Sequence, residues 1–171
     1  MNDNKPTSGF VADIDDENDF NSTHHNGGFS NISEAYVSKS GFNRIFSAVR
    51  YGKRYMLKCL KPDFAYTPTY RQALMKEFEI GLQLDHPNIC RIISMEPVGE
   101  LGDCIVMEYV DGETLEAAVK GGNITEEKVR KIASQLLDAM EYMHAKQTVH
   151  RDIKPSNIML THRGGDVKLI A

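Results

Sequence analysis

The sequence predicts an α+β protein in which a five-stranded antiparallel sheet with one helix precedes a mainly helical part. Three observations lead to this fold class. Short β-like segments bounded by turn residues fill residues 32–60 and return at 90–109. One helical pattern separates these two groups of strands. The longest amphipathic pattern comes only afterwards, and strands followed by helices are typical of α+β folds.

The first group contains three predicted strands, joined by turns at Gly41 and at the Tyr51-Gly52 pair. A helix is then predicted from Thr67-Pro68, an N-cap residue followed by a first-turn proline. The His86-Pro87-Asn88 segment ends it. Apolar residues recur along it every four positions, at Leu74, Phe78 and Leu82. The five strands are predicted at residues 32–38, 44–50, 54–60, 90–95 and 104–109.

The clearest helix is predicted at residues 126–145. Thr125 caps it, and the acidic pair Glu126 and Glu127 complements its N-terminal dipole. A short strand at 158–160, a turn at 163–165 and a last strand at 166–170 follow. The apolar stripe of the helix consists of Val129, Ile132, Ala133, Leu136, Leu137, Met140 and Met143. We expect these side chains to fill a core.

Composition sets limits on the partners of the chain. The 20 Lys and Arg against 24 Asp and Glu give a net charge of -4, which does not favour nucleic acid or an anionic membrane. Residues 1–30 are acidic and rich in Asn, which predicts a disordered leader. Neither a secretory signal nor an apolar run long enough for a membrane span is present, so a cytoplasmic protein is expected. Cys59, Cys90 and Cys104 are predicted to be reduced core thiols.

The segment 149–160 places three chemically useful side chains in one irregular loop. Asp152, Lys154 and Asn157 stand at offsets of 0, 2 and 5. Phosphoryl transfer needs an aligned hydroxyl and a neutralised phosphate chain more than covalent help from the protein. Asp152 suits acceptance of the hydroxyl proton, Lys154 suits neutralisation of the phosphoryl group, and the Asn157 amide oxygen suits a magnesium ion. The alternative is a polar surface turn with a chance arrangement.

This stretch resembles the catalytic loop of eukaryotic-type Ser/Thr protein kinases over its whole length. The resemblance extends from about residue 32 to residue 170. It implies an N-lobe with its hinge at residues 31–110, after the leader, and a partial C-lobe at 111–171. Lys58 stands where the family anchors ATP, and Glu77 where the family has the partner of that lysine. The resemblance therefore implies ATP and Mg²⁺ as cofactors and a protein Ser or Thr hydroxyl as substrate.

The resemblance also implies the lining of a nucleotide pocket. Met107 is the gatekeeper position, and the backbone of Glu108 and Val110 is expected to face adenine. The phosphate-covering loop is expected around Ser38, Ser40 and Asn43, which replace the three glycines of the family pattern. Because glycine permits close backbone approach and positive φ, these replacements weaken phosphate binding. The remaining pocket positions are Ile45, Met56 and Met159.

This sequence departs most from the family pattern at residue 171. Ala171 stands where the family has the magnesium-binding Asp of its Asp-Phe-Gly motif. We therefore expect an incomplete C-lobe, an apolar helix face open to a partner protein, and little turnover from these 171 residues. A noncatalytic pseudokinase-like binding module is the main alternative. A kinase-like phosphotransferase acting on a small molecule is a third, disfavoured by Arg151 and Lys154.

Overall fold

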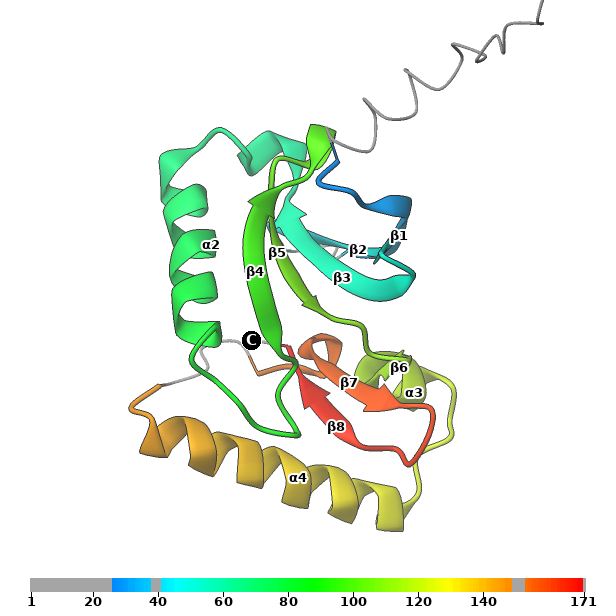
Figure 1. Cartoon of the computed structure of the whole chain (residues 1–171). Helices are drawn as coiled ribbons and strands as arrows, with labels where there is room; N and C mark the ends of the chain where they lie inside the picture. Colours follow the sequence, from blue (N-terminus) through cyan, green and yellow to red (C-terminus); the bar gives the residue numbers. More distant parts are fainter. Residues whose placement is uncertain (1–25, 38–40, 149–152, 171) are drawn as a thin grey trace, which may run out of the picture.

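The structure is a computed structural model of the 171-residue chain, and it describes residues 26–37, 41–148 and 153–170. Ser38, Ser40, Asp152, Ala171 and most of the expected leader lie outside the described residues. The described residues form a large sheet with one helix along it, above a small sheet and a long helix (Figure 1). None of the described helices is long and apolar enough to cross a membrane.

The larger sheet has five antiparallel strands, as the sequence predicts, and their order across the sheet is β1-β2-β3-β5-β4. Tyr51 and Gly52, with φ of 52° and 71°, form a two-residue turn between β2 and β3. Two successive positive φ angles are the signature of a turn that matches the twist of a hairpin. The strands are β1 Ser30–Val37, β2 Asn43–Arg50, β3 Lys53–Leu60, β4 Ile92–Pro97 and β5 Asp103–Glu108.

Both faces of this sheet carry buried side chains. Successive side chains of β3 and β5 point to opposite sides, so these strands contribute to both faces. Met56, Ile105 and Met107 belong to the cluster beneath the helix α2. Leu57 and Val106 belong to a second cluster on the other face. The second cluster also holds Phe29, Phe46, Ala48, Cys59, Val98 and Cys104. The helix therefore covers only one face, and residues next to the strands cover the other.

Residues 26–30 are folded although composition places them in the leader. Residues 26–28 form a turn, Phe29 is buried, and β1 starts at Ser30. The leader boundary expected at residue 30 is therefore placed too late. Gly27 and Gly28 lie within the expected leader and have φ of 62° and 79°. These positive φ angles allow the turn that directs Phe29 into the core.

Helix α2 spans Pro68–Gly81 and runs beside β4 (Figure 1). Thr67 occupies the N-cap position, but its side chain makes no capping hydrogen bond, so the predicted cap is wrong in that detail. Leu74 is buried and Phe78 is half-buried against the core. Leu82, the third apolar residue of the predicted spacing, is the C-cap residue of the helix and is exposed.

Strand β4 starts two residues later than predicted. The Cys90 amide donates to the Leu169 carbonyl (2.8 Å), and Ile89 forms a parallel bridge with Leu169. These backbone groups are committed to the C-terminal strand β8, Val167–Leu169, so pairing with β5 begins only at Ile92. A contact between residues almost eighty positions apart in sequence thus decides where the strand begins.

The C-terminal part contains two elements that sequence patterns did not predict. Strand β6, Gly112–Thr114, pairs with β7, Ile158–Thr161, in a small sheet of order β6-β7-β8. Helix α3, Leu115–Lys120, follows directly, with the Thr114 hydroxyl accepting from the Ala117 amide (3.1 Å). Three- and six-residue elements are too short to show a period of their own. Three short 3₁₀ turns complete the fold: η1 Pro62–Phe64, η2 Gly99–Leu101 and η3 Pro155–Asn157.

Helix α4, Glu126–Ala145, has the predicted bounds and the predicted cap, in which the Thr125 hydroxyl accepts from the Lys128 amide (3.2 Å). It packs beneath the small sheet through Ile132, Ala139 and Met143 (Figure 1). The apolar stripe is only partly buried. Val129, Ala133, Leu137 and Met140, spaced by four, four and three residues, are exposed. Their expected role as core residues is therefore wrong in the described structure, whereas the expected open apolar face is present.

A charge on this exposed stripe should therefore cost little. Leu137, whose side chain is 63% exposed, is the most exposed member. We expect Leu137→Lys to change the free energy of unfolding by less than about 0.5 kcal/mol, since surface substitutions usually do. It should also reduce self-association, measured by light scattering alongside urea unfolding. A loss of more than about 2 kcal/mol, the cost of deleting a core side chain, would contradict the exposure of this face.

The three cysteines are free and buried, as predicted. Burial, with a smaller contribution from Glu108, raises the pKa of the Cys90 thiol to about 12. A hydrogen bond between Cys59 and Cys104, on the neighbouring strands β3 and β5, raises the pKa of Cys104 and lowers that of Cys59. Both of these side chains are fully buried in the sheet.

Because a thiol must be both deprotonated and accessible to react, the native protein should resist alkylation. We expect iodoacetamide at pH 8 to leave Cys59, Cys90 and Cys104 unmodified within minutes, and to modify all of them in urea. Mass spectrometry of the intact chain counts the adducts. Rapid labelling of a cysteine in the folded protein would show that the sheet opens far more readily than its packing indicates.

Candidate active site

Lys58 and Glu77, which are 19 positions apart, meet as an ion pair between β3 and α2. Their side chains are only 12% and 26% exposed. The pairing expected from the sequence is therefore present. Removing water from a charged pair strengthens the hydrogen bond between them and makes an unpaired partner costly. The ammonium group of Lys58 is thus held at a fixed place at the edge of the covered face.

The position of Lys58 follows from the register of the sheet. It lies in the central strand β3, opposite Ile45 of β2 and Ile105 of β5. The alternation along β3 turns Met56 and Lys58 toward the face covered by α2, and turns Leu57 away from it. A shift of one residue would send the lysine to the opposite face. The ladders on both sides therefore fix the lysine where Glu77 can reach it.

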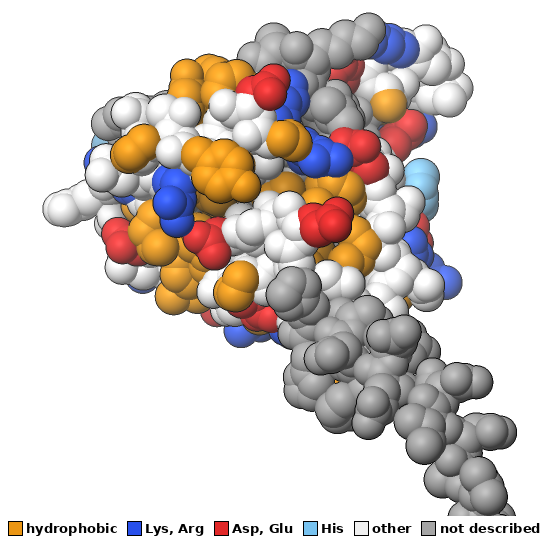
Figure 2. Space-filling view, turned by 90° about the horizontal axis from the view of Figure 1, so that it is seen from above, with side chains coloured by type: hydrophobic (Ala, Val, Ile, Leu, Met, Phe, Trp, Pro, Cys, Tyr) orange, Lys and Arg blue, Asp and Glu red, His pale blue; other side chains and the backbone are white. Residues whose placement is uncertain are grey.

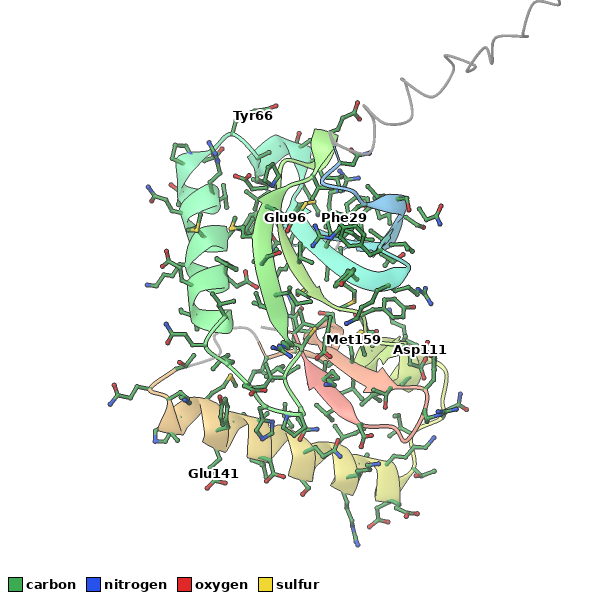
Figure 3. All side chains as sticks on the ribbon, in the orientation of Figure 1. Phe29, Tyr66, Glu96, Asp111, Glu141 and Met159 are labelled. Carbon is green, nitrogen blue, oxygen red and sulfur yellow. The ribbon has the colours of Figure 1, made fainter. Side chains whose placement is uncertain are left out.

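The predicted pocket residues come together although they lie in four strands and the hinge. Met56 and Met107 are directly opposite each other across β3 and β5. Met159 rises from β7 and lies beneath the large sheet (Figure 3). Ile45, Met56, Met107, Val110 and Met159 all join the same hydrophobic cluster. One continuous apolar cluster thus reaches from the N-terminal sheet to the small sheet, next to the Lys58–Glu77 pair.

Glu108 connects the two parts of the molecule. Its carboxylate accepts from the Arg91 amide (2.9 Å) and from the Lys168 ammonium (3.1 Å), and its own amide donates to the Arg91 carbonyl (2.9 Å). The Cys90 thiol lies 3.6 Å from its carbonyl oxygen. Because a carbonyl oxygen has two lone pairs, the Glu108 carbonyl can accept a second donor besides the Cys90 thiol.

Lys154 and Asn157 frame the 3₁₀ turn η3. Lys154 is its N-cap residue, and its carbonyl accepts from the Asn157 amide (2.9 Å). The Asn157 carbonyl in turn accepts from the Ile170 amide (2.9 Å). Asn157 is therefore fixed beside the end of β8, next to the position at which the sequence pattern of the family has a magnesium ligand. Asp152, the third predicted member of this loop, lies outside the described residues.

Several residues that hold this arrangement were missed in the sequence. Asn88 is buried: its side-chain amide donates to the Val167 carbonyl (3.0 Å), and its carbonyl accepts from the Leu169 amide (2.8 Å). Lys168 pairs with Glu108 across the two parts. The His86-Pro87-Asn88 segment marks Asn88 only as the end of a helix, and no local pattern shows these contacts, because the partners lie sixty or more positions away in the chain.

Three residues replace family glycines in the expected phosphate-covering loop. Of these, only Asn43 is among the described residues. Asn43 starts β2 opposite Leu60, and its side-chain carbonyl oxygen is buried without a hydrogen-bond partner in the described structure. A buried polar atom without a partner is costly and usually marks a place where a ligand, water or ion is missing. A phosphate oxygen cannot satisfy this atom, since both are acceptors, whereas the amide nitrogen of the same side chain can donate to one.

Magnesium fits the described residues only in part. Asn157 supplies one amide oxygen, a ligand type that Mg²⁺ accepts, but magnesium sites are built mainly from carboxylates, waters and substrate phosphates. In the described part of the chain, no group of three or more His, Cys, Asp or Glu side chains is placed to hold a metal ion. Residue 171 is an alanine. These residues therefore do not by themselves form a magnesium site.

Comparison with known proteins agrees with this arrangement. The family model described as "Protein kinase domain" matches residues 39–170. The chain belongs to the protein kinase domain family. The shared part includes both lobes of the described structure, from the β1–β2 turn to the end of β8. The resemblance drawn from the sequence is therefore confirmed at the level of the family.

The relatives include mitogen-activated protein kinase kinases. Mitogen-activated protein kinase kinase 9 of Arabidopsis thaliana is 42% identical over 118 residues, which cover 67% of this chain and 36% of that protein. Mitogen-activated protein kinase kinase 7 of the same plant is 34% identical over 146 residues, covering 82% and 45%. The crystal structure of Rad53 1–466 in complex with AMP-PNP superposes with a TM-score of 0.65 at 27% identity, covering 83% and 37%.

The chain thus spans less than half the length of each of these proteins. The fold class is confirmed: a kinase N-lobe, built on a five-stranded antiparallel sheet with one helix, followed by part of a C-lobe. The small sheet β6-β7-β8 and α4 form that part.

Proposed function

We propose that this chain carries the nucleotide site and catalytic loop of an ATP-dependent protein Ser/Thr kinase. The observation that supports this best is the ion pair of Lys58 and Glu77 at the edge of an apolar surface formed by Met56, Met107 and Met159. Apolar side chains suit contact with a purine, and a fixed ammonium beside them suits the phosphates. The structure of Rad53 is a complex with AMP-PNP, which supports a nucleotide as the ligand proposed for this chain.

In this proposal Lys58 neutralises phosphate charge, and Glu77 keeps its ammonium in position. The adenine lies on the apolar surface, and the Glu108 carbonyl and the Val110 backbone supply its polar contacts. Asn43 donates its side-chain amide toward the phosphates. Because protein charges that are fixed in advance need no reorganisation during the reaction, such contacts stabilise a transition state more than water does.

The loop at residues 152–157 completes the site. Asp152 accepts the proton of the substrate hydroxyl as its oxygen bonds to the terminal phosphorus, while the bond from that phosphorus to the β-phosphate oxygen breaks and ADP leaves. Lys154 stabilises the charge on the transferred phosphoryl group, and Asn157 lies in η3 beside the end of β8. Mg²⁺, when carried in by ATP, would neutralise charge between the phosphates. A Ser or Thr hydroxyl on a protein is the proposed acceptor.

Two further parts of the proposal concern the surroundings of the molecule. A partner surface is proposed to cover the exposed stripe of α4, since contiguous apolar patches usually mark interaction sites. A reducing compartment such as the cytoplasm is proposed because the described cysteines are free thiols inside the core. Neither nucleic acid nor a membrane surface is proposed as a partner, given the net charge of -4.

Calorimetry with ATP, in magnesium and in excess EDTA, tests the nucleotide site directly. We expect ATP to bind in magnesium and to bind more weakly in EDTA. Transfer of the terminal phosphate to Ser- and Tyr-containing peptides of otherwise equal sequence then tests the reaction. Binding together with transfer to the Ser peptide supports a kinase. Binding without transfer favours the noncatalytic binding module, and no binding by a folded chain overturns the nucleotide site.

A further inference from the structure

Three aromatic rings meet where the β1–β2 turn approaches the start of helix α2. The Phe42 ring centroid lies 4.9 Å from that of Phe64 and 4.5 Å from that of Tyr70, and the Phe64 and Tyr70 centroids are 4.8 Å apart. The interplanar angles of 81°, 41° and 65° are edge or tilted arrangements, which the quadrupoles of aromatic rings favour. Phe42 directly precedes β2, Phe64 lies in η1 and Tyr70 lies in α2, so the trio joins three separate segments.

A backbone hydrogen bond also holds Phe42 next to the end of β3. The Lys61 amide donates to the Phe42 carbonyl (2.8 Å), one residue beyond the end of β3. Next to it, Asn43 pairs with Leu60 in the β2–β3 ladder. Phe42 is thus held through its backbone to β3 and through its ring to the loop and helix that follow β3.

Helix α2 and strand β3 link the three rings to the ion pair of Lys58 and Glu77. Tyr70 and Glu77 are seven residues apart in α2, which is two helical turns, so they lie on the same side of the helix. Glu77 holds Lys58, and Lys58 lies two residues before Leu60 in β3. Phe42, Tyr70, Glu77 and Lys58 are therefore linked in one circuit, in which helix α2 and strand β3 connect the ring contacts to the ion pair.

We propose that Phe42, Phe64 and Tyr70 form an aromatic clasp that sets the position of helix α2, and through Glu77 the position of Lys58, relative to the phosphate-covering turn. This inference rests on the proposed nucleotide site and adds positioning residues to it. The clasp ties the residue before β2 to the helix that orients the phosphate-binding lysine.

The exposure of Phe42 separates this role from ordinary core packing. Phe42 is 45% exposed, so it is only partly buried. Its ring packs against those of Phe64 and Tyr70. The face that carries the start of α2, seen from above in Figure 2, shows hydrophobic side chains at the surface among charged ones. A structural role alone predicts a small effect of Phe42 on stability and none on nucleotide affinity.

A double-mutant cycle on ATP affinity in magnesium tests the clasp. The variants are Phe42→Ala, Tyr70→Leu, which keeps an apolar side chain in the core, and the double variant. Each single change should raise the Kd for ATP about three- to tenfold, the factor that corresponds to losing aromatic pairs. The double variant should bind no more weakly than the weaker single variant, because both changes break the same circuit. Additive effects, or none, overturn the proposal.

Two control variants sharpen this result. Tyr66→Ala removes a neighbouring ring that is 90% exposed at the top of the molecule (Figure 3), and it should leave the Kd unchanged. Tyr70→Phe keeps the ring and should also leave it unchanged. A loss of affinity in Tyr66→Ala equal to that in Phe42→Ala would show a general effect of surface aromatics and would overturn the clasp.

Amide hydrogen exchange tests the clasp without nucleotide, so its failure can be told apart from failure of the nucleotide site. Phe42→Ala should speed exchange of the Arg71 amide, which closes the first turn of α2 on Thr67. Tyr70→Leu should speed exchange of the Lys61 amide, which is bonded to Phe42. If these remote amides are unaffected, the clasp is overturned, even in a chain that binds ATP. If they respond in a chain that binds no ATP, the clasp stands and the nucleotide site fails.

A spectroscopic signal provides an independent check. The chain has no tryptophan, so Phe42→Trp introduces a single indole that can be excited selectively. Its emission should shift to longer wavelength when Tyr70→Leu is added, because the ring loses its packing partner and gains water. The same shift should be absent with Tyr66→Ala. An emission maximum of free, solvated indole before any second change would show that position 42 makes no clasp.

Discussion

Replacing Lys58 with methionine should weaken binding of ATP in magnesium by about 100-fold, the order expected when one member of a buried, hydrogen-bonded charge pair is removed. Methionine keeps the apolar stem of the side chain, so the β2-β3-β5 ladder should persist. The ammonium that faces the phosphates is lost, and the Glu77 carboxylate, 26% exposed, is left without its partner. Calorimetry on the folded variant measures the change.

Matched controls lie on the same two elements. Lys53→Met removes an exposed lysine from the start of β3, and Glu79→Gln removes an exposed charge from α2 beside Glu77. Both should bind ATP as the unaltered chain does. Glu77→Gln should weaken binding less than Lys58→Met, since the lysine charge remains. Equal affinity of Lys58→Met and the unaltered chain would remove this lysine from the nucleotide site.

Replacing Phe29 with alanine should lower the free energy of unfolding by about 3 to 5 kcal/mol, the usual cost of truncating a buried aromatic ring. The ring is buried against the face of the sheet opposite α2 and meets Tyr55 edge-on, with centroids 6.0 Å apart. The Arg50 guanidinium lies 4.2 Å from its centroid, donates to the Gly27 carbonyl and pairs with Glu96. Phe29 and Glu96 lie close together in Figure 3.

Urea unfolding of Phe29→Ala against Tyr51→Ala measures this effect. Tyr51 is 97% exposed in the β2–β3 turn, so its loss should change stability by less than about 0.5 kcal/mol. Deletion of residues 1–25 should leave stability unchanged within the same range, whereas deletion through Phe29 should match the alanine variant. A destabilisation below about 1 kcal/mol in Phe29→Ala would mean that the segment before β1 is not part of the folded unit.

The contrast between Phe29 and Lys58 shows where sequence reasoning works in this protein. Lys58 and Glu77 were found through a motif at the other end of the chain, the segment at 149–160, which fixed the family and thereby the meaning of two otherwise ordinary charges. Phe29 follows a polar, glycine-containing stretch and carries no periodic pattern, so composition assigned it to the leader. Its burial depends on Val98 and other residues far along the chain.

The same contrast holds for the elements. Long periodic segments such as 126–145 were predicted with their bounds, because each turn of an amphipathic helix repeats the signal. Strand β6 and the start of β4 were not, because their limits depend on pairing with β7 and β8. The stripe of α4 shows the limit of periodicity itself: the pattern locates the helix, but which of its apolar residues are covered depends on what lies against them.

By itself the sequence determined the kinase family, the order of the main strands and helices, and the residue types of the catalytic loop, because these reside in local spacing and short motifs. Only the tertiary structure decided that Glu108 joins Arg91 and Lys168, that Phe29 belongs to the core, and that Phe42 meets Phe64 and Tyr70. Each of these contacts is made between segments separated along the chain. Its free energy exists only after the loops between them have closed, so no local stretch of sequence encodes it.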